Sequence, residues 1–214
     1  MRPRQRAFDY PVVTTFGRGD FLVSDSNRDA LGWIERWPDW PTRALALHGP
    51  SGSGKTHLAH LWCERAGGTL IAGADVTDTG LLGAAVAIDD ADRAAERPLL
   101  HLYNSALERG ANLLLTMPAP PASLPMALPD LASRLRALPV VGIAPPDDEL
   151  LGAVLVKHFA DRQIRVGPGV IAYLVARIER SFAAASSVAA RLDAAALSAG
   201  RPITVKLARA VLAE

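Results

Sequence analysis

Cysteine and lysine are scarce in this chain of 214 residues, which contains one cysteine, Cys63, and three lysines, Lys55, Lys157 and Lys206. A single cysteine cannot form an internal disulfide, so a secreted domain held together by disulfides is excluded. The net charge of +1 argues against a surface wrapped in nucleic acid, although it leaves room for a local basic patch. No apolar run approaches the ~18 residues of a membrane helix, and the N-terminus lacks an apolar signal segment. We therefore expect a cytoplasmic protein with no membrane partner.

Half of the residues are hydrophobic, which is enough to bury one substantial core and a small second domain. Between residues 21 and 144, short apolar runs alternate with helical patterns, as a parallel α/β sheet requires. The strands of this sheet are expected at residues 44–48, 69–72, 85–89, 112–116 and 139–143.

Pro145 and Pro146 end the alternating pattern, and the rest of the chain is helical in pattern. Asp147 is expected to cap a helix that runs to about Arg162, and further helices are expected at 168–179, 182–198 and 204–213. Three parts result: an extended leader (1–20), an α/β nucleotide-binding domain (21–144) and a helical lid (145–214). A P-loop NTPase domain with a five-stranded parallel sheet, followed by a small helical lid, is the outline of an AAA+ module.

Residues 49–56 fit the phosphate-loop pattern G-x-x-x-x-G-K-[ST] at every fixed position. An apolar strand precedes them and a helix follows, so a chance glycine-rich loop is the weaker reading. In such a loop the lysine contacts the β- and γ-phosphates, and the threonine hydroxyl ligates Mg²⁺. We expect ATP or ADP with Mg²⁺, bound by Gly49, Pro50, Ser51, Gly52, Ser53, Gly54, Lys55 and Thr56.

Two acids, Asp89 and Asp90, end the apolar strand predicted at 85–89. An isolated pair of this kind is usually a solvated turn, but a phosphate loop requires an acidic strand beside it. The first carboxylate of such a pair holds Mg²⁺ and its water shell, and the second polarises the attacking water. We therefore assign Asp89, with Thr56, to the metal and Asp90 to catalysis. Most AAA+ ATPases carry glutamate at the second position, so the shorter Asp90 is expected to reach the water less well.

Several segments resemble the DnaA family of bacterial replication initiators, and most closely its short regulatory Hda branch. They include the segment LYNSALERG at 102–110, LPDLASRL at 128–135 and FLVSDSN at 21–27. DnaA continues past its lid into a helix-turn-helix DNA-binding domain that has no counterpart in this sequence, as in Hda. The resemblance implies that Arg134, in the S-R-L segment, is an arginine finger that reaches the γ-phosphate of a neighbour's ATP. The alternative is that Arg134 is an ordinary surface arginine, and Arg136, two residues on, is a second arginine that could be mistaken for the finger.

Two departures from the family pattern concern the sensors of the γ-phosphate. After the fourth strand the family's charged pair is replaced by Pro118 and Ala119, which leaves Thr116 as a possible partial substitute. In the lid, Ala183 stands where the family has a second-sensor arginine, and Arg180 lies one turn earlier. We expect ADP to bind at least as well as ATP and the chain's own ATP hydrolysis to be weak.

The leader contains Gln5, Phe8 and Tyr10, which resemble the clamp-binding peptide Q-x-x-[hydrophobic]-x-[aromatic]. Such peptides dock in a groove of the sliding clamp, and an extended segment suits that docking. The two aromatic residues could instead pack on the protein's own core. The expected partners are thus DnaA and the sliding clamp of DNA polymerase III, with DNA contacted mainly through the clamp and with a possible homo-oligomer.

These expectations combine into a negative regulator of replication initiation that promotes hydrolysis of DnaA-bound ATP. The main alternative is an AAA+ loader or clamp-dependent adaptor in which the nucleotide is structural and no hydrolysis is stimulated. A self-contained P-loop ATPase or kinase is disfavoured by the lid and by the arginine-finger segment.

Overall fold

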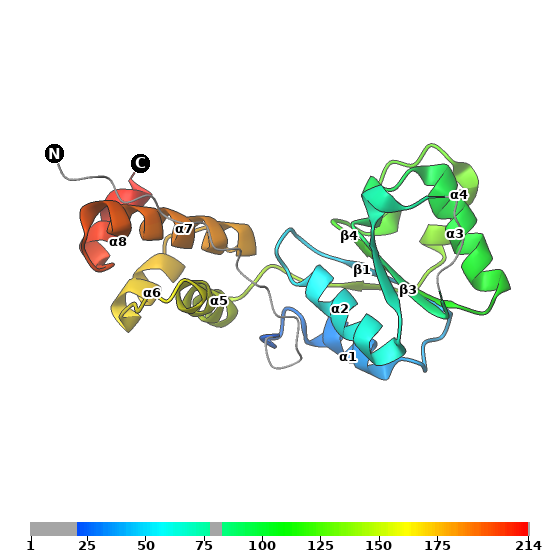
Figure 1. Cartoon of the computed structure of the whole chain (residues 1–214), viewed down its shortest axis with the longest axis horizontal. Coiled ribbons are helices and arrows are strands. Elements are labelled where there is room, and N and C mark those ends of the chain that lie inside the picture. Colours follow the sequence, from blue (N-terminus) through cyan, green and yellow to red (C-terminus); the bar gives the residue numbers. More distant parts are fainter. Residues whose placement is uncertain (1–20, 78–82, 214) are drawn as a thin grey trace.

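The structure, a computed structural model, describes residues 21–77 and 83–213 (Figure 1). A sheet-bearing part and a helical part lie side by side and are joined by the segment that follows the last strand. The elements of the first part are α1 (Arg28–Arg36), β1 (Ala44–His48), α2 (Lys55–Ala66), β2 (Thr69–Ala72), β3 (Ala85–Asp89), α3 (Glu96–Glu108), β4 (Asn112–Met117), α4 (Pro129–Arg136) and β5 (Val140–Gly142). Those of the second are α5 (Asp148–Asp161), α6 (Pro168–Val175), α7 (Phe182–Ala199) and α8 (Val205–Leu212).

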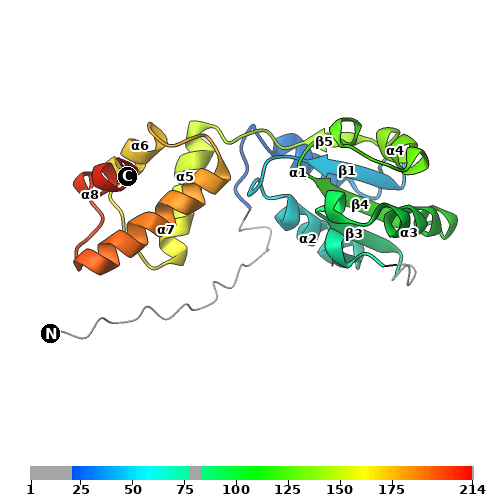
Figure 2. The same cartoon turned by 90° about the horizontal axis from the view of Figure 1, so that it is seen from above.

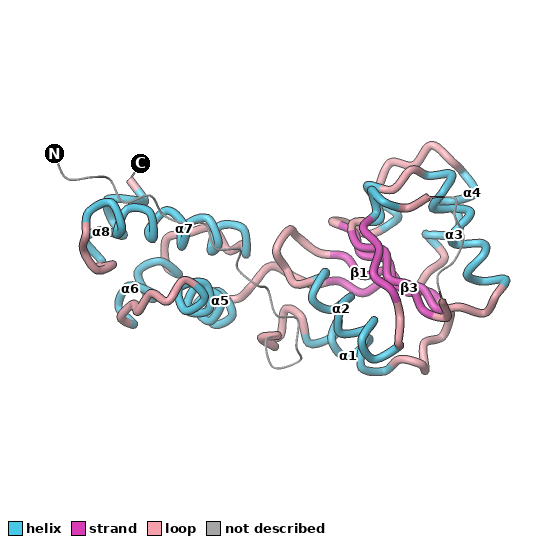
Figure 3. Tube along the Cα trace, viewed as in Figure 1, coloured by secondary structure: helices cyan, strands magenta, loops and turns pink. Residues whose placement is uncertain are grey.

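The five strands form one parallel sheet in the order β2-β3-β4-β1-β5. Figure 3 shows the strands together in magenta, with helices beside them in cyan. All five lie where the sequence predicts them, although β4 runs one residue further and β5 is one residue shorter at each end. Because every strand runs in the same direction, the loops that follow β1, β3 and β4 meet at one edge of the sheet. The phosphate loop, the acidic pair and Thr116 are thereby brought together.

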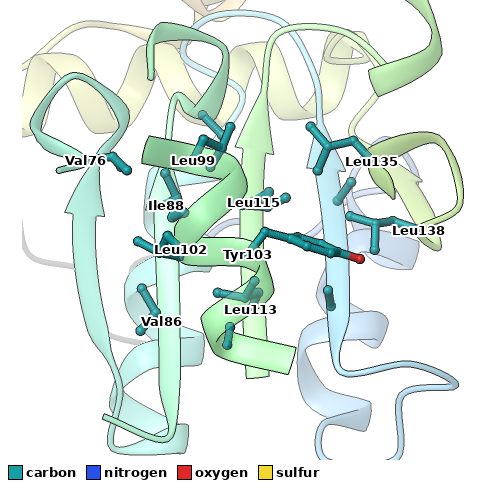
Figure 4. Close-up of a cluster of buried hydrophobic side chains, with 14 of the residues drawn as sticks. Val76, Val86, Ile88, Leu99, Leu102, Tyr103, Leu113, Leu115, Leu135 and Leu138 are labelled. Atoms are coloured by element: carbon teal, nitrogen blue, oxygen red, sulfur yellow. The ribbon is translucent and has the colours of Figure 1, made fainter. Parts of the chain in front are cut away.

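Alternate residues of each strand point to opposite faces of the sheet, and both faces are covered by helices. On one face, α3 and α4 bury a cluster that includes Val86, Leu115 and Tyr103 (Figure 4). On the other face, α1 and α2 bury Leu45, Leu47 and Trp62, among other residues. The P-loop NTPase fold predicted from the sequence is confirmed.

The helical part has its own core, built from α5, α6, α7 and α8 (Figure 2). Asp147 caps α5 as expected, because its Oδ1 accepts a hydrogen bond of 2.7 Å from the N–H of Leu150. The helix expected at 168–179 is shorter than predicted and ends at Val175. The N–H groups of Arg177 and Ile178 both donate to the carbonyl of Leu174, which closes a turn before Ser181 caps α7. None of the helices in the described ranges is long and apolar enough to cross a membrane.

Candidate nucleotide-binding site

The phosphate loop connects β1 to α2 and depends on its glycines. Gly52 and Gly54 have φ values of 77° and 94°, a left-handed conformation that favours glycine. A Cβ on Gly52 would lie 2.8 Å from the Cβ of Phe182, and one on Gly54 would lie 2.9 Å from the ring of Phe21. The loop therefore packs between the start of α7 and the segment before α1, and no larger residue fits at these two positions.

Lys55 is buried at the first position of α2. Its Nζ donates to the carbonyl oxygens of Gly49, at 2.9 Å, and Pro50, at 3.0 Å. Burial lowers the pKa of this ammonium, and the nearby carboxylates of Asp90 and Asp89 oppose that lowering. The lysine predicted to contact phosphate thus lies inside the loop, close to the acidic pair.

Ser53 gives independent support for a ligand in the loop. Its hydroxyl oxygen is buried and has no hydrogen-bond partner. A buried hydroxyl without a partner costs free energy, which an incoming polar ligand can recover. The loop's backbone, Lys55 and Ser53 together fit the phosphates of a nucleotide.

Asp89 and Thr56 meet as the Mg²⁺ assignment requires. Thr56 lies on α2 and Asp89 ends β3, and the Thr56 hydroxyl donates to Oδ2 of Asp89 at 2.7 Å. A hydroxyl beside a carboxylate is the arrangement that holds Mg²⁺ in phosphate-loop proteins, where the nucleotide and water complete the coordination. These residues therefore fit the metal predicted from the sequence.

Thr116 forms hydrogen bonds with both members of the acidic pair. Its side chain is fully buried on β4, and its hydroxyl donates to Oδ1 of Asp89 at 2.5 Å while it accepts from the N–H of Asp90 at 2.9 Å. Both oxygens of Asp89 are thus held by threonine hydroxyls. The partial sensor role considered for Thr116 stays a prediction, and in this structure its hydroxyl is bonded to the two acids.

Asp90 adopts a left-handed conformation, with φ 51° and ψ 52°, and precedes the short turn Ala91–Arg93. This conformation is uncommon outside glycine, although aspartate tolerates it better than most residues. The carboxylate lies 3.8 Å from the Arg93 guanidinium and close enough to Lys55 to affect its pKa. Asp90 is therefore located near the phosphate loop, as its predicted catalytic role requires.

We expect loss of the Thr116 hydroxyl to destabilise the acidic pair. Thr116→Val keeps the shape but removes one hydrogen bond each from Asp89 and Asp90, so the free energy of unfolding should fall by about 1–3 kcal/mol. Urea unfolding measures that change, and Thr116→Ser, which keeps the hydroxyl, is the matched control. Equal stability of the Val and Ser variants would contradict this role.

A cavity of about 390 Å³ lies between the phosphate loop and the helical part. This volume is within the usual range for small-molecule sites. Three groups of residues line it: Phe21, Leu22 and Asn27 before or at the start of α1, Ser51 to Gly54 of the loop, and Leu150, Val154, Lys157, His158, Phe182, Ala183 and Ser186 of α5 and α7. The cavity extends the phosphate loop into a site large enough for a nucleoside.

The α5 wall of this cavity was missed by the sequence analysis. Leu150 and Val154 supply apolar surface, and Lys157 and His158 lie one turn further along the same helix. Burial lowers the pKa of His158, and the cations of Arg162 and Lys157 lower it further. The scarcity of lysine was the one signal in the sequence that could have drawn attention to Lys157.

Ala183, which the family resemblance aligns with a second-sensor arginine, lies in the wall of the cavity. The backbone nitrogen of Ala183 is close to the phosphate loop, since it would be 3.6 Å from a Cβ on Gly52. Because the residue is alanine, it contributes only a methyl group to the wall of the cavity. Arg180 does not replace the missing arginine in this structure. Its guanidinium forms two hydrogen bonds with Asp148, at 2.7 and 3.0 Å, and it is not among the residues that line the cavity.

Arg134 lies on α4 and also does not line the nucleotide cavity. Its Nε donates to Oδ1 of Asp130, one turn earlier, at 3.1 Å. The Arg134 side chain is 38% exposed. Burial raises the pKa of the Tyr103 hydroxyl, and the nearby positive charge of Arg134 opposes that rise. An arginine in this position is accessible to a partner protein and does not contribute to the nucleotide cavity of its own chain.

Gln5, Phe8 and Tyr10, predicted to bind the clamp, lie outside the described residues.

Comparison with known proteins agrees with this fold. Residues 147–212 match the family described as "Hda, lid domain". Domain III of the replication initiation protein DnaA from Thermotoga maritima matches with a TM-score of 0.78 and 17% identity, over 92% of this chain and 95% of that one.

Two further structures share the fold at lower identity. AMPPCP-bound DnaA from Aquifex aeolicus matches with a TM-score of 0.64 and 15% identity, over 83% of this chain and 65% of that one. The Thermotoga maritima RuvB Holliday junction branch migration motor matches with a TM-score of 0.69 and 14% identity, over 93% of this chain and 72% of that one. The described chain thus spans slightly less than two thirds of the Aquifex initiator, and its fold is that of an AAA+ protein with an Hda-type lid.

Proposed function

We propose that this chain, which is an Hda/DnaA-like AAA+ protein, binds an adenine nucleotide with Mg²⁺ and promotes hydrolysis of the ATP held by DnaA. In this proposal it acts together with the sliding clamp and restrains replication initiation. The nucleotide part is supported by the intact phosphate loop, the Thr56–Asp89 pair and the cavity beside them. An AAA+ structure of the same fold with AMPPCP bound gives further support.

The observation that carries the regulatory part is the separation of Arg134 from the chain's own cavity. The candidate nucleotide site lies at one edge of the sheet, whereas Arg134 lies on α4 and does not line the cavity of that site. An arginine supplied in trans neutralises charge that develops on the transferred phosphoryl group of a neighbour's ATP. The residue would therefore act on a bound partner.

The lid wall supports slow turnover of the chain's own nucleotide. Ala183 offers no charge to a γ-phosphate, and Arg180 is held by Asp148. Without those contacts, ATP loses interactions that ADP never makes, so discrimination between the two should be weak. Bound nucleotide would then stabilise the fold and the lid position, and ADP would serve as well as ATP.

Mg²⁺ supplies charge neutralisation at the phosphates when it is bound with the nucleotide. Thr56 and Asp89 would hold it, and Thr116 keeps Asp89 oriented. Asp90, whose N–H donates to the same Thr116 hydroxyl, would polarise the attacking water. The proposed regulation is tested by single-turnover hydrolysis of ATP on DnaA, with and without this chain and the clamp loaded on DNA. The loader or adaptor alternative predicts no stimulation in that assay.

Clamp binding is proposed to depend on the leader residues Gln5, Phe8 and Tyr10. Changing Gln5 and Phe8 together to alanine should weaken clamp binding at least about tenfold, since a glutamine and an apolar anchor are lost from a short peptide. Surface plasmon resonance on immobilised clamp measures the loss, and unchanged nucleotide affinity is the control. Normal clamp binding by the double variant would show that the leader is not the docking peptide.

A further inference from the structure

Glu96 accepts two backbone hydrogen bonds from a segment far along the chain. The N–H of Ala127 donates to Oε1 at 2.7 Å, and the N–H of Leu128 donates to Oε2 at 2.6 Å. Glu96 is the first residue of α3, and Leu128 is the N-cap residue of α4, where no side chain of the helix itself forms a cap. Hydrogen bonds to a carboxylate are roughly twice as strong as neutral ones. One side chain of α3 therefore fixes the entry to α4.

A cavity of about 170 Å³ lies between the start of α3, the segment before α4 and α4 itself. Glu96, Leu99, Leu131 and Leu135 are among the residues that line it. Leu131 and Leu135 are almost fully buried, so the hydrogen bonds of Glu96 act together with this apolar packing to set the position of the helix.

Glu96 also lies close in sequence to the acidic pair of the nucleotide site. The turn Ala91–Arg93 follows Asp90 directly, and Glu96 starts α3 three residues after that turn ends. At the other end of the contact, α4 has only eight residues and carries Arg134 in its last turn. The Glu96 carboxylate is thus a direct link between the segment behind the acidic pair and the helix that carries the arginine.

We propose that Glu96 is a positioning residue for Arg134: its carboxylate clamps the N–H groups of Ala127 and Leu128 and thereby sets the position of α4. This inference rests on the proposed role of Arg134 in stimulating a partner's hydrolysis. An arginine finger must meet a transition state within a fraction of an ångström, and a misplacement of 1 Å can cost about 100-fold in rate. A small shift of α4 would therefore weaken stimulation without changing the arginine itself.

The test is Glu96→Gln, which keeps one acceptor oxygen but turns the other into an amide that cannot accept an N–H. In single-turnover hydrolysis by ATP–DnaA, the stimulated rate at saturating protein should fall about 10- to 100-fold. The concentration giving half the maximal effect should stay within about twofold, because the proposal gives Glu96 a role in positioning Arg134 and none in binding DnaA. Amide exchange at Ala127 and Leu128 should become faster, and nucleotide affinity should not change.

Glu108→Gln is the matched control, since Glu108 is the exposed last residue of the same helix. It should leave stimulation and amide exchange at wild-type values. If Glu96→Gln speeds amide exchange but stimulates as strongly as wild type, the carboxylate is only a helix cap and the inference fails. If the wild-type chain does not stimulate hydrolysis at all, the proposed function fails, which is a different and separable result.

Discussion

Arg134→Ala is expected to lose nearly all stimulation of DnaA-bound ATP hydrolysis, a fall of about 10³-fold or more, as for other arginine fingers acting in trans. The guanidinium is needed only when charge develops on the transferred phosphoryl group, so its removal should not affect binding in the ground state. The fold should also tolerate the change, since the partner Asp130 is exposed and exposed ion pairs contribute at most about 1 kcal/mol. Single-turnover hydrolysis measures the loss, and urea unfolding verifies the fold.

Arg136→Ala is the matched control for this experiment. Arg136 is an exposed arginine on the same helix, two residues from Arg134 and outside the nucleotide cavity. Its removal lowers the local charge by the same amount as removal of Arg134. We expect the stimulated rate of hydrolysis to fall less than about tenfold, because only long-range electrostatics change. If Arg136→Ala and Arg134→Ala reduced stimulation equally, the effect would be one of net charge and Arg134 would not be a finger.

Lys55→Ala should abolish measurable nucleotide binding, with a loss of affinity of at least about 100-fold, equivalent to about 2.7 kcal/mol. The buried ammonium is the cation of the loop, and its charge-assisted bonds to phosphate have no substitute there. Isothermal calorimetry with ADP and Mg²⁺ measures the change.

Lys206→Ala is the control for Lys55→Ala, because Lys206 is an exposed lysine on α8 and lines no part of the nucleotide cavity. It should bind ADP as wild type does. Retained affinity in Lys55→Ala would instead place the nucleotide elsewhere in the chain.

The arrangement of the sheet could be predicted from the sequence because every strand is a short apolar run between clear breaks. The phosphate loop is also a local pattern, so its eight residues and the strand and helix beside it follow from spacing alone. The end of α6 could not be found in this way. The segment after Val175 keeps a helical pattern, and the turn that stops it is made by two N–H groups donating to the same carbonyl of Leu174.

The polar contacts between elements were beyond the reach of a single sequence. Thr116 looks like a residue exposed at a strand end, but its register beside β3 directs the hydroxyl to Asp89 and Asp90. Arg180 is three residues before Ala183 in the sequence, yet Asp148 on α5 holds its guanidinium. Glu96 and Leu128 are separated by 32 residues, so no local pattern indicates their contact. In each case the deciding partner belongs to another element.

The most direct test of the proposed regulation is the rate of ATP hydrolysis on DnaA in the presence of the wild-type chain. DnaA loaded with labelled ATP is mixed with this chain, saturated with ADP and Mg²⁺, and with the clamp on DNA, and a single turnover is followed. The account predicts a rate on the order of 10³-fold above that of DnaA alone, which falls to the basal rate when the clamp or this chain is omitted. A rate equal to that of DnaA alone in the complete mixture would contradict it.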